Sequence, residues 1–119
     1  MADGVLLIQT EPRAGREAEY ERFYDGVHVP EILQTPGFER ARRFRAVRSS
    51  ELPERPDGEW HSNLVIYDVI ADDLAGAYAG LIDRMHSGQL TRRDVFSDER
   101  PYRAMLFERT FEAQGATTA

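Results

Sequence analysis

The strongest constraint on the fold is the order in which two apolar periodicities follow one another along the chain. Strand-like segments, with alternating or continuous apolar residues, occupy residues 4–10, 38–47, 61–71 and 102–111. Segments with a helical apolar stripe begin at Ala14 and after Asp72–Asp73, and Gly88 is expected to end the second. The order is therefore β-α-β-β-α-β. It predicts an α+β, ferredoxin-like fold with a four-stranded antiparallel sheet and both helices on one face.

Three of the expected strands, the first, third and fourth, carry apolar residues on both faces. Helices on one side of a sheet leave the other side without a cover. A second copy of the chain is the simplest cover, so we expect a homodimer in which two sheets pack face to face, that is, a dimeric α+β barrel.

We expect a single domain over residues 1–113 and a disordered tail over 114–119, since 119 residues suffice for one core and not two. Residues 49–59 contain Pro53, Pro56 and Asp57-Gly58 and indicate a turn-rich loop. Residues 89–101 are polar and irregular, which favours a loop with its own role, such as a lid.

Composition excludes several kinds of chemistry. The chain has no cysteine, and all of its basic residues are arginine, so thiolate nucleophiles and lysine Schiff bases are absent. The formal net charge of −6 argues against nucleic acid or an anionic membrane as a general partner. No apolar run approaches a membrane span and no signal-peptide pattern is present, so we expect a cytoplasmic protein.

The most unusual stretch runs from Phe23 to Phe38. Tyr24, Asp25 and His28 fall within one helical turn, which brings a phenol, a carboxylate and an imidazole within reach of one another. We expect His28 to act as a general acid or base, with Asp25 orienting its ring. The alternatives stay open: His28 could cap a carbonyl, Asp25 could face solvent, and Tyr24 could simply pack in the core.

Pro30 is expected to end this helix, because proline lacks an N–H donor and its ring clashes with the preceding turn. It should also bias Val29 toward an extended conformation. Pro36-Gly37 then predicts a turn before the chain resumes at Phe38.

This stretch resembles the EthD-like families of the dimeric α+β barrel superfamily. The residues that carry the resemblance are Phe23-Tyr24-Asp25, His28-Val29-Pro30-Glu31-Ile32-Leu33 and Pro36-Gly37-Phe38, which lead into the arginine-bearing strand. Proteins of this kind are typically free of cofactors. The resemblance implies a barrel pocket for polyketides or small aromatic and lactone compounds, used by cyclases, dehydratases, decarboxylases or isomerases. Other branches of the superfamily are quinone-forming monooxygenases or bind haem.

Two further groups are candidates for substrate binding. Arg43 and Arg45 share a strand face with the small Ala41, where a guanidinium could bind a carboxylate or enolate. Charged residues also protect edge strands, so a structural role is the alternative. The third strand places on one face His61, Asn63, Val65 and Tyr67. Tyr67 could stabilise an enolate oxygen, and the others suit an oxygenated ligand.

We therefore expect a cofactor-independent enzyme that moves protons on a polyketide-like or small aromatic substrate. The favoured reaction is cyclisation or dehydration, and the next candidate is decarboxylation or isomerisation. We expect the reaction to belong to secondary metabolism. The expected catalytic residues are His28, Asp25 and Tyr67. Those expected to bind substrate are Tyr24, Arg43, Arg45, His61, Asn63 and Val65. No metal site is expected, since the three histidines lack the spacing of a helix-borne site. The alternatives are a non-catalytic small-molecule-binding accessory protein and a cofactor-free monooxygenase.

Overall fold

The structure, a computed structural model, describes residues 1–53 and 61–116. Part of the expected loop (54–60) and the end of the expected tail (117–119) lie outside these residues. In chain order the elements are β1 (Ala2–Thr10), α1 (Glu17–Phe23), the π-helical turn η1 (Tyr24–His28), α2 (Val29–Ile32), β2 (Phe38–Arg45), β3 (Asn63–Ala71), α3 (Leu74–His86) and β4 (Arg103–Glu108). The predicted α+β, ferredoxin-like class is confirmed.

The four strands form one antiparallel sheet in the order β2-β3-β1-β4. The two central strands, β1 and β3, are adjacent, and Leu6 is paired with Tyr67 of β3 on one side and Leu106 of β4 on the other. Two β-α-β units interleave in this order, and the β1–β3 pairing holds their inner strands together.

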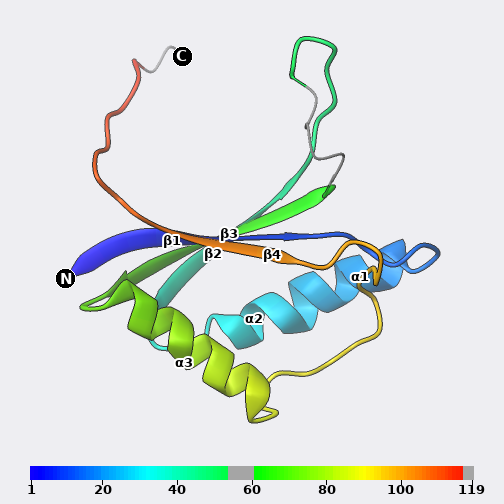
Figure 1. Cartoon of the computed structure of the whole chain (residues 1–119), viewed down its shortest axis with the longest axis horizontal. Coiled ribbons are helices and arrows are strands. Elements are labelled where there is room, and N and C mark those ends of the chain that lie inside the picture. Colours follow the sequence, from blue (N-terminus) through cyan, green and yellow to red (C-terminus); the bar gives the residue numbers. More distant parts are fainter. Residues whose placement is uncertain (54–60, 117–119) are drawn as a thin grey trace.

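All the helices lie on one face of the sheet (Figure 1). The buried core sits between the two layers, and the sheet contributes to it Leu6, Val65, Tyr67 and Val69. The alternation in β3 is as the sequence predicts, with every second residue from Asn63 to Val69 buried. In the described residues, no helix has the length and apolar character needed to cross a membrane.

The opposite face of the sheet carries large apolar side chains that remain open to solvent. Phe44 of β2 is 45% exposed, and Phe107 of β4 is 53% exposed. Ile70 and Met105 are each 37% exposed. Among the residues that the structure describes, no helix covers these four side chains, because all the helices lie on the other face of the sheet.

The expectation that Pro30 ends the helix and makes Val29 extended is wrong. Val29 is helical, with φ −61° and ψ −48°, and the helix continues as α2. The chain first widens into η1, in which the N–H of Val29 bonds to the carbonyl of Tyr24, five residues back. This wider turn makes room for the proline ring, and Pro30 lies in the first turn of α2, where a missing N–H costs little. The turn predicted at Gly37 is present, with φ +94°.

Candidate functional site

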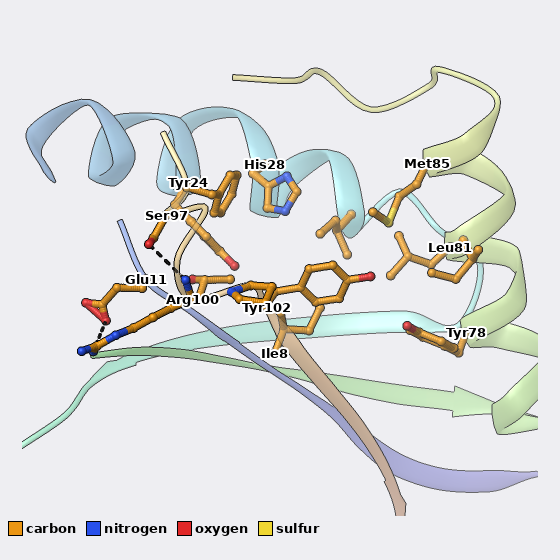
Figure 2. Close-up of a pocket in the computed structure, with 15 residues that line it drawn as sticks. Ile8, Glu11, Tyr24, His28, Tyr78, Leu81, Met85, Ser97, Arg100 and Tyr102 are labelled. Atoms are coloured by element: carbon orange, nitrogen blue, oxygen red, sulfur yellow. Dashed lines mark hydrogen bonds and ion pairs between the residues drawn. The ribbon is translucent and has the colours of Figure 1, made fainter. Parts of the chain in front are cut away.

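A cavity of about 290 Å³ lies between the helices and the sheet. Its wall is mostly apolar (Figure 2). The lining residues are Ile8, Thr10, Glu11, Tyr24, His28, Ile32, Tyr78, Leu81, Ile82, Met85, Phe96, Ser97, Arg100, Pro101 and Tyr102. They come from β1, from the η1–α2 region, from α3 and from the segment between α3 and β4. Its size and apolar character suit a small organic ligand.

His28, the last residue of η1, stands at the wall of this cavity above Tyr102 (Figure 2). Its ring lies among aromatic side chains, with centroids 5.3 Å from Phe23, 5.1 Å from Tyr24 and 6.0 Å from Phe96. Nδ1 is buried and has no hydrogen-bond partner among the described residues. Burial lowers the pKa of His28 to about 4, partly opposed by the negative charge of Glu31. The imidazole is therefore neutral at physiological pH, which is the form in which it can act as a base.

Glu31, three residues after His28, anchors the segment between α3 and β4. Its two carboxylate oxygens accept hydrogen bonds from Thr91, one from the backbone N–H and one from the hydroxyl, each at 2.8 Å. These bonds lower the pKa of Glu31. Arg84 of α3 donates to the Glu31 carbonyl at 2.8 Å and to the Thr35 hydroxyl. The element that carries His28 is thus tied to both α3 and the loop after it.

The loop from residue 87 to 102 forms one wall of the cavity. Its middle is held by hydrogen bonds to the residues that follow β1. Arg13 N–H donates to the Val95 carbonyl at 2.7 Å, and Ser97 N–H donates to the Glu11 carbonyl at 2.8 Å. Val95 is 1% exposed, and Phe96 packs edge-on against the aromatic residues around His28. The predicted irregular loop therefore contributes directly to the site.

The cavity is polar at the end where Glu11, Ser97 and Arg100 meet (Figure 2). The Glu11 carboxylate accepts hydrogen bonds from the backbone N–H and the hydroxyl of Ser62, at 3.0 and 2.6 Å. Arg100 Nη1 lies 3.9 Å from the same carboxylate. The Glu11 side chain is thus held in place by Ser62 and by the nearby Arg100, which belong to two other segments.

A second polar group of the wall consists of hydroxyls. Thr10, which lines the cavity and is 4% exposed, shares a hydrogen bond with the Tyr20 hydroxyl. Tyr24 also lines the cavity and is 1% exposed. Burial raises the pKa of both tyrosines, so both are protonated and can donate hydrogen bonds at neutral pH.

Tyr24 and His28 are in contact in the structure, whereas Asp25 contacts Arg43 and not His28. The Asp25 carboxylate accepts a hydrogen bond from Arg43 at 2.7 Å and is largely exposed. Glu31, and not Asp25, is the acidic residue that raises the pKa of His28. Sequence reasoning assumed α-helical spacing between Asp25 and His28, whereas the intervening turn is π-helical.

Tyr67 is fully buried on the helix-covered face of the sheet and does not line the cavity. Its hydroxyl has no hydrogen-bond partner in the described part of the chain. Burial raises its pKa. Tyr67 and Val65, which is 1% exposed, lie within the core on the sheet side.

The remaining candidates lie around the ends of β2 and β3. His61 Nε2 donates to the Pro101 carbonyl at 2.9 Å, and His61 is 7% exposed. Asn63 donates to the Ser62 hydroxyl and accepts from Arg43. Arg45 is mostly exposed and lies 3.8 Å from Glu21. None of Arg43, Arg45, His61 and Asn63 lines the cavity.

Most of the residues that do line the cavity were not identified as site residues from the sequence. One signal was present, since the apolar stripe of α3 that includes Tyr78, Leu81, Ile82 and Met85 faces the cavity. The residues from the irregular loop gave no periodic signal. Within residues 1–53 and 61–116 there is no cluster of three or more His, Asp or Glu residues that could hold a metal ion.

No protein-family model matches the chain, and no curated protein matches it. Among solved structures, the chain is similar to an ethyl tert-butyl ether D (EthD) family protein from Bacillus halodurans C-125. The TM-score is 0.51 and the identity 18%, and the match covers 92% of this chain and 100% of the other. At this level of identity the likeness shows the fold alone, and the chain therefore has an EthD-like, ferredoxin-like α+β fold.

Proposed function

We propose that the cavity binds a small, largely apolar ring compound that carries oxygen substituents, and that His28 moves a proton on this compound without a cofactor. The observation that carries the proposal is the His28 imidazole at the cavity wall, neutral and with a buried Nδ1 that no described residue bonds. A buried polar atom without a partner is costly, and in native proteins such an atom can mark a group with a catalytic role.

The chemistry follows from the protonation state. A neutral imidazole can remove a proton from an acidic C–H or O–H group and return it elsewhere. The negative charge that then develops on the substrate stabilises the imidazolium, as does Glu31. Thr10 and Tyr24 line the same cavity, and hydroxyl side chains such as theirs are suited to hydrogen-bond substrate oxygens. These features support cyclisation or dehydration of a polyketide-like or aromatic compound as the reaction. Decarboxylation or isomerisation is the second candidate.

The protein is further proposed to act as a homodimer whose two sheets pack face to face. Support comes from the exposed apolar side chains of the open face, including Phe44 and Phe107. Figure 1 shows the segment after β4 extending away from the sheet on the side opposite the helices. A second sheet would bury this surface.

The proton-transfer proposal can be tested before the natural substrate is known. The probe 5-nitrobenzisoxazole reports a base in an apolar pocket: the base removes the C3 proton, the N–O bond breaks, and coloured 2-cyano-4-nitrophenolate forms. The native protein should accelerate this reaction over buffer, and His28→Ala should reduce the acceleration by about 10²-fold or more. His86→Ala, at an exposed histidine of α3, is the matched control and should leave the rate unchanged.

A parallel binding measurement separates an enzyme from a binding protein. The affinity of the fluorescent probe 2-naphthol should stay within about tenfold in His28→Ala if the imidazole serves the chemistry. Tight binding without any acceleration by the native protein would indicate a binding protein instead. Oxygen uptake in proportion to product, with a phenol substrate, would indicate a monooxygenase.

A further inference from the structure

One guanidinium, that of Arg43, connects three elements behind the cavity wall. Its Nη1 donates to Glu21 of α1 and to Asp25 of η1, both at 2.7 Å. Its Nη2 donates to Asn63 of β3 at 3.3 Å. The side chain is 18% exposed and does not line the cavity. A planar guanidinium with five donors suits a junction of this kind, whereas an ammonium does not.

The same guanidinium packs against the ring of Tyr24. The Arg43 guanidinium carbon lies 4.7 Å from the centroid of the Tyr24 ring and 5.7 Å from that of Tyr20. Both distances are within the range of a cation–π contact. Tyr24 lines the cavity. A displacement of the Arg43 guanidinium would therefore also displace a ring of the cavity wall.

Arg43 also acts where the helix changes its register. Glu21 belongs to the α-helical turn before η1, and Asp25 is the second residue of η1, which His28 ends. Single π-helical turns are rare and are often found at functional sites, and their hydrogen-bonding pattern differs from that of the flanking α-helix. Two ion pairs from one guanidinium, one on either side of the change, hold this turn to the sheet.

We propose that Arg43 is a positioning residue, which holds Tyr24 and η1 so that His28 faces the cavity, and that Asp25 serves Arg43 rather than His28. This inference rests on the proton transfer proposed above. It assigns to the Arg43–Asp25 pair a role in the geometry of the site rather than in substrate binding or in a His28–Asp25 dyad.

Variants of Arg43 test the positioning role. Arg43→Met removes the junction, and Arg43→Lys keeps the charge without the planar donors. Arg42→Met is the matched control, since Arg42 lies next to it in β2 but bonds Asp68 on the open face. With 5-nitrobenzisoxazole, both Arg43 variants should lose at least about tenfold in kcat with KM changed by less than about threefold, and the control should match the native protein.

Variants of Asp25 distinguish the Arg43–Asp25 pair proposed here from a catalytic His28–Asp25 dyad. Asp25→Asn keeps a side-chain oxygen that can accept from Arg43, so kcat and the His28 pKa should stay close to native. Asp25→Ala removes the acceptor and should behave like Arg43→Met. If Asp25→Asn instead lowers the His28 pKa as much as Asp25→Ala does, the carboxylate acts on His28 directly and the inference is overturned.

The imidazole and tyrosine ring proton signals of His28 and Tyr24, measured by NMR, give a readout that does not depend on activity. If the native protein does not accelerate the probe reaction, the proton-transfer proposal fails, while these signals still decide the positioning role. They should move in Arg43→Met and Arg43→Lys and remain at their native positions in Arg42→Met. If Arg43→Met does not fold, Arg43→Lys decides, and native signals in a folded Arg43→Lys would overturn the inference.

Discussion

Glu31 binds Thr91 through both of its carboxylate oxygens, at 2.8 Å each, and so fastens the loop that forms one cavity wall to the helix that carries His28. The same carboxylate is the charge that raises the pKa of His28 against the effect of burial. One side chain therefore affects both the closure of the site and the basicity of the imidazole.

Replacing Glu31 by Gln should lower the pKa of His28 below about 4, because the negative charge that stabilises the imidazolium is removed. Gln retains one oxygen that can accept from Thr91, so the loop should stay largely in place. Thr91→Val removes the hydroxyl but keeps the backbone donor and the charge of Glu31. In NMR titrations of the imidazole, the His28 pKa should therefore fall in Glu31→Gln and remain native in Thr91→Val. An equal fall in both would mean that loop closure, and not charge, sets the pKa.

The buried imidazole makes stability depend on pH in a defined window. Burial lowers the pKa of His28 from 6.5 to about 4, so between these values the unfolded chain binds more protons than the folded one. The contribution of His28 is fully present above about pH 6.5 and is lost progressively down to about pH 4. This lowering of the His28 pKa corresponds to about 3 kcal/mol of unfolding free energy.

His28→Leu, which cannot titrate, should lack this part of the pH dependence. Urea unfolding at several pH values between 4 and 7 gives the comparison, since other groups that titrate contribute equally to both proteins. The difference in unfolding free energy between the native protein and His28→Leu should become less favourable to the native protein as the pH falls. A difference that stays constant over this range would show that His28 is readily protonated in the folded state.

The strand and helix order could be predicted from the sequence because apolar periodicity reports directly on burial. The alternation from Asn63 to Val69 correctly grouped the residues that share one face of β3, and this face is the buried one. The same reasoning could not place Asp25, because spacing alone assumes an α-helix and ignores a competing partner. Arg43, distant in sequence, reaches Asp25 only once β2 lies beside the helix.

The walls of the site were the least predictable part. Phe96, Ser97 and Arg100 come from a segment with no regular structure, where neither a two-residue nor a 3.6-residue period applies. Their positions depend on backbone hydrogen bonds to Glu11 and Arg13, far away in the sequence. Long-range contacts of this kind leave no local pattern.

The π-helical turn should depend on Pro30. Pro30→Ala restores a backbone N–H and removes the ring, so an ordinary α-helical register becomes possible through η1. We expect the unfolding free energy to stay native or rise, while the NMR signals of His28 shift and the affinity for 2-naphthol falls. Gly26→Ala is the control: an added Cβ at Gly26 meets no atom within 4 Å, and the change should stabilise by roughly 0.5–1 kcal/mol without altering the His28 signals. Unchanged His28 signals in Pro30→Ala would show that the π-turn does not need the proline.

The open face of the sheet gives the last prediction, which concerns assembly. Phe107 is 53% exposed on the outer strand β4, opposite Val5 of β1. If two sheets pack together, Phe107→Glu places a charge in an apolar interface and should weaken the dimer by at least about tenfold. Sedimentation at micromolar concentration should then show a dimer for the native protein and mostly monomer for the variant. Asp83→Asn, at an exposed residue of α3 on the helix-covered side of the sheet, is the control and should remain dimeric. A native protein that sediments only as a monomer, with a cooperative melt, would falsify the face-to-face dimer, because the apolar face would then be stable in water on its own.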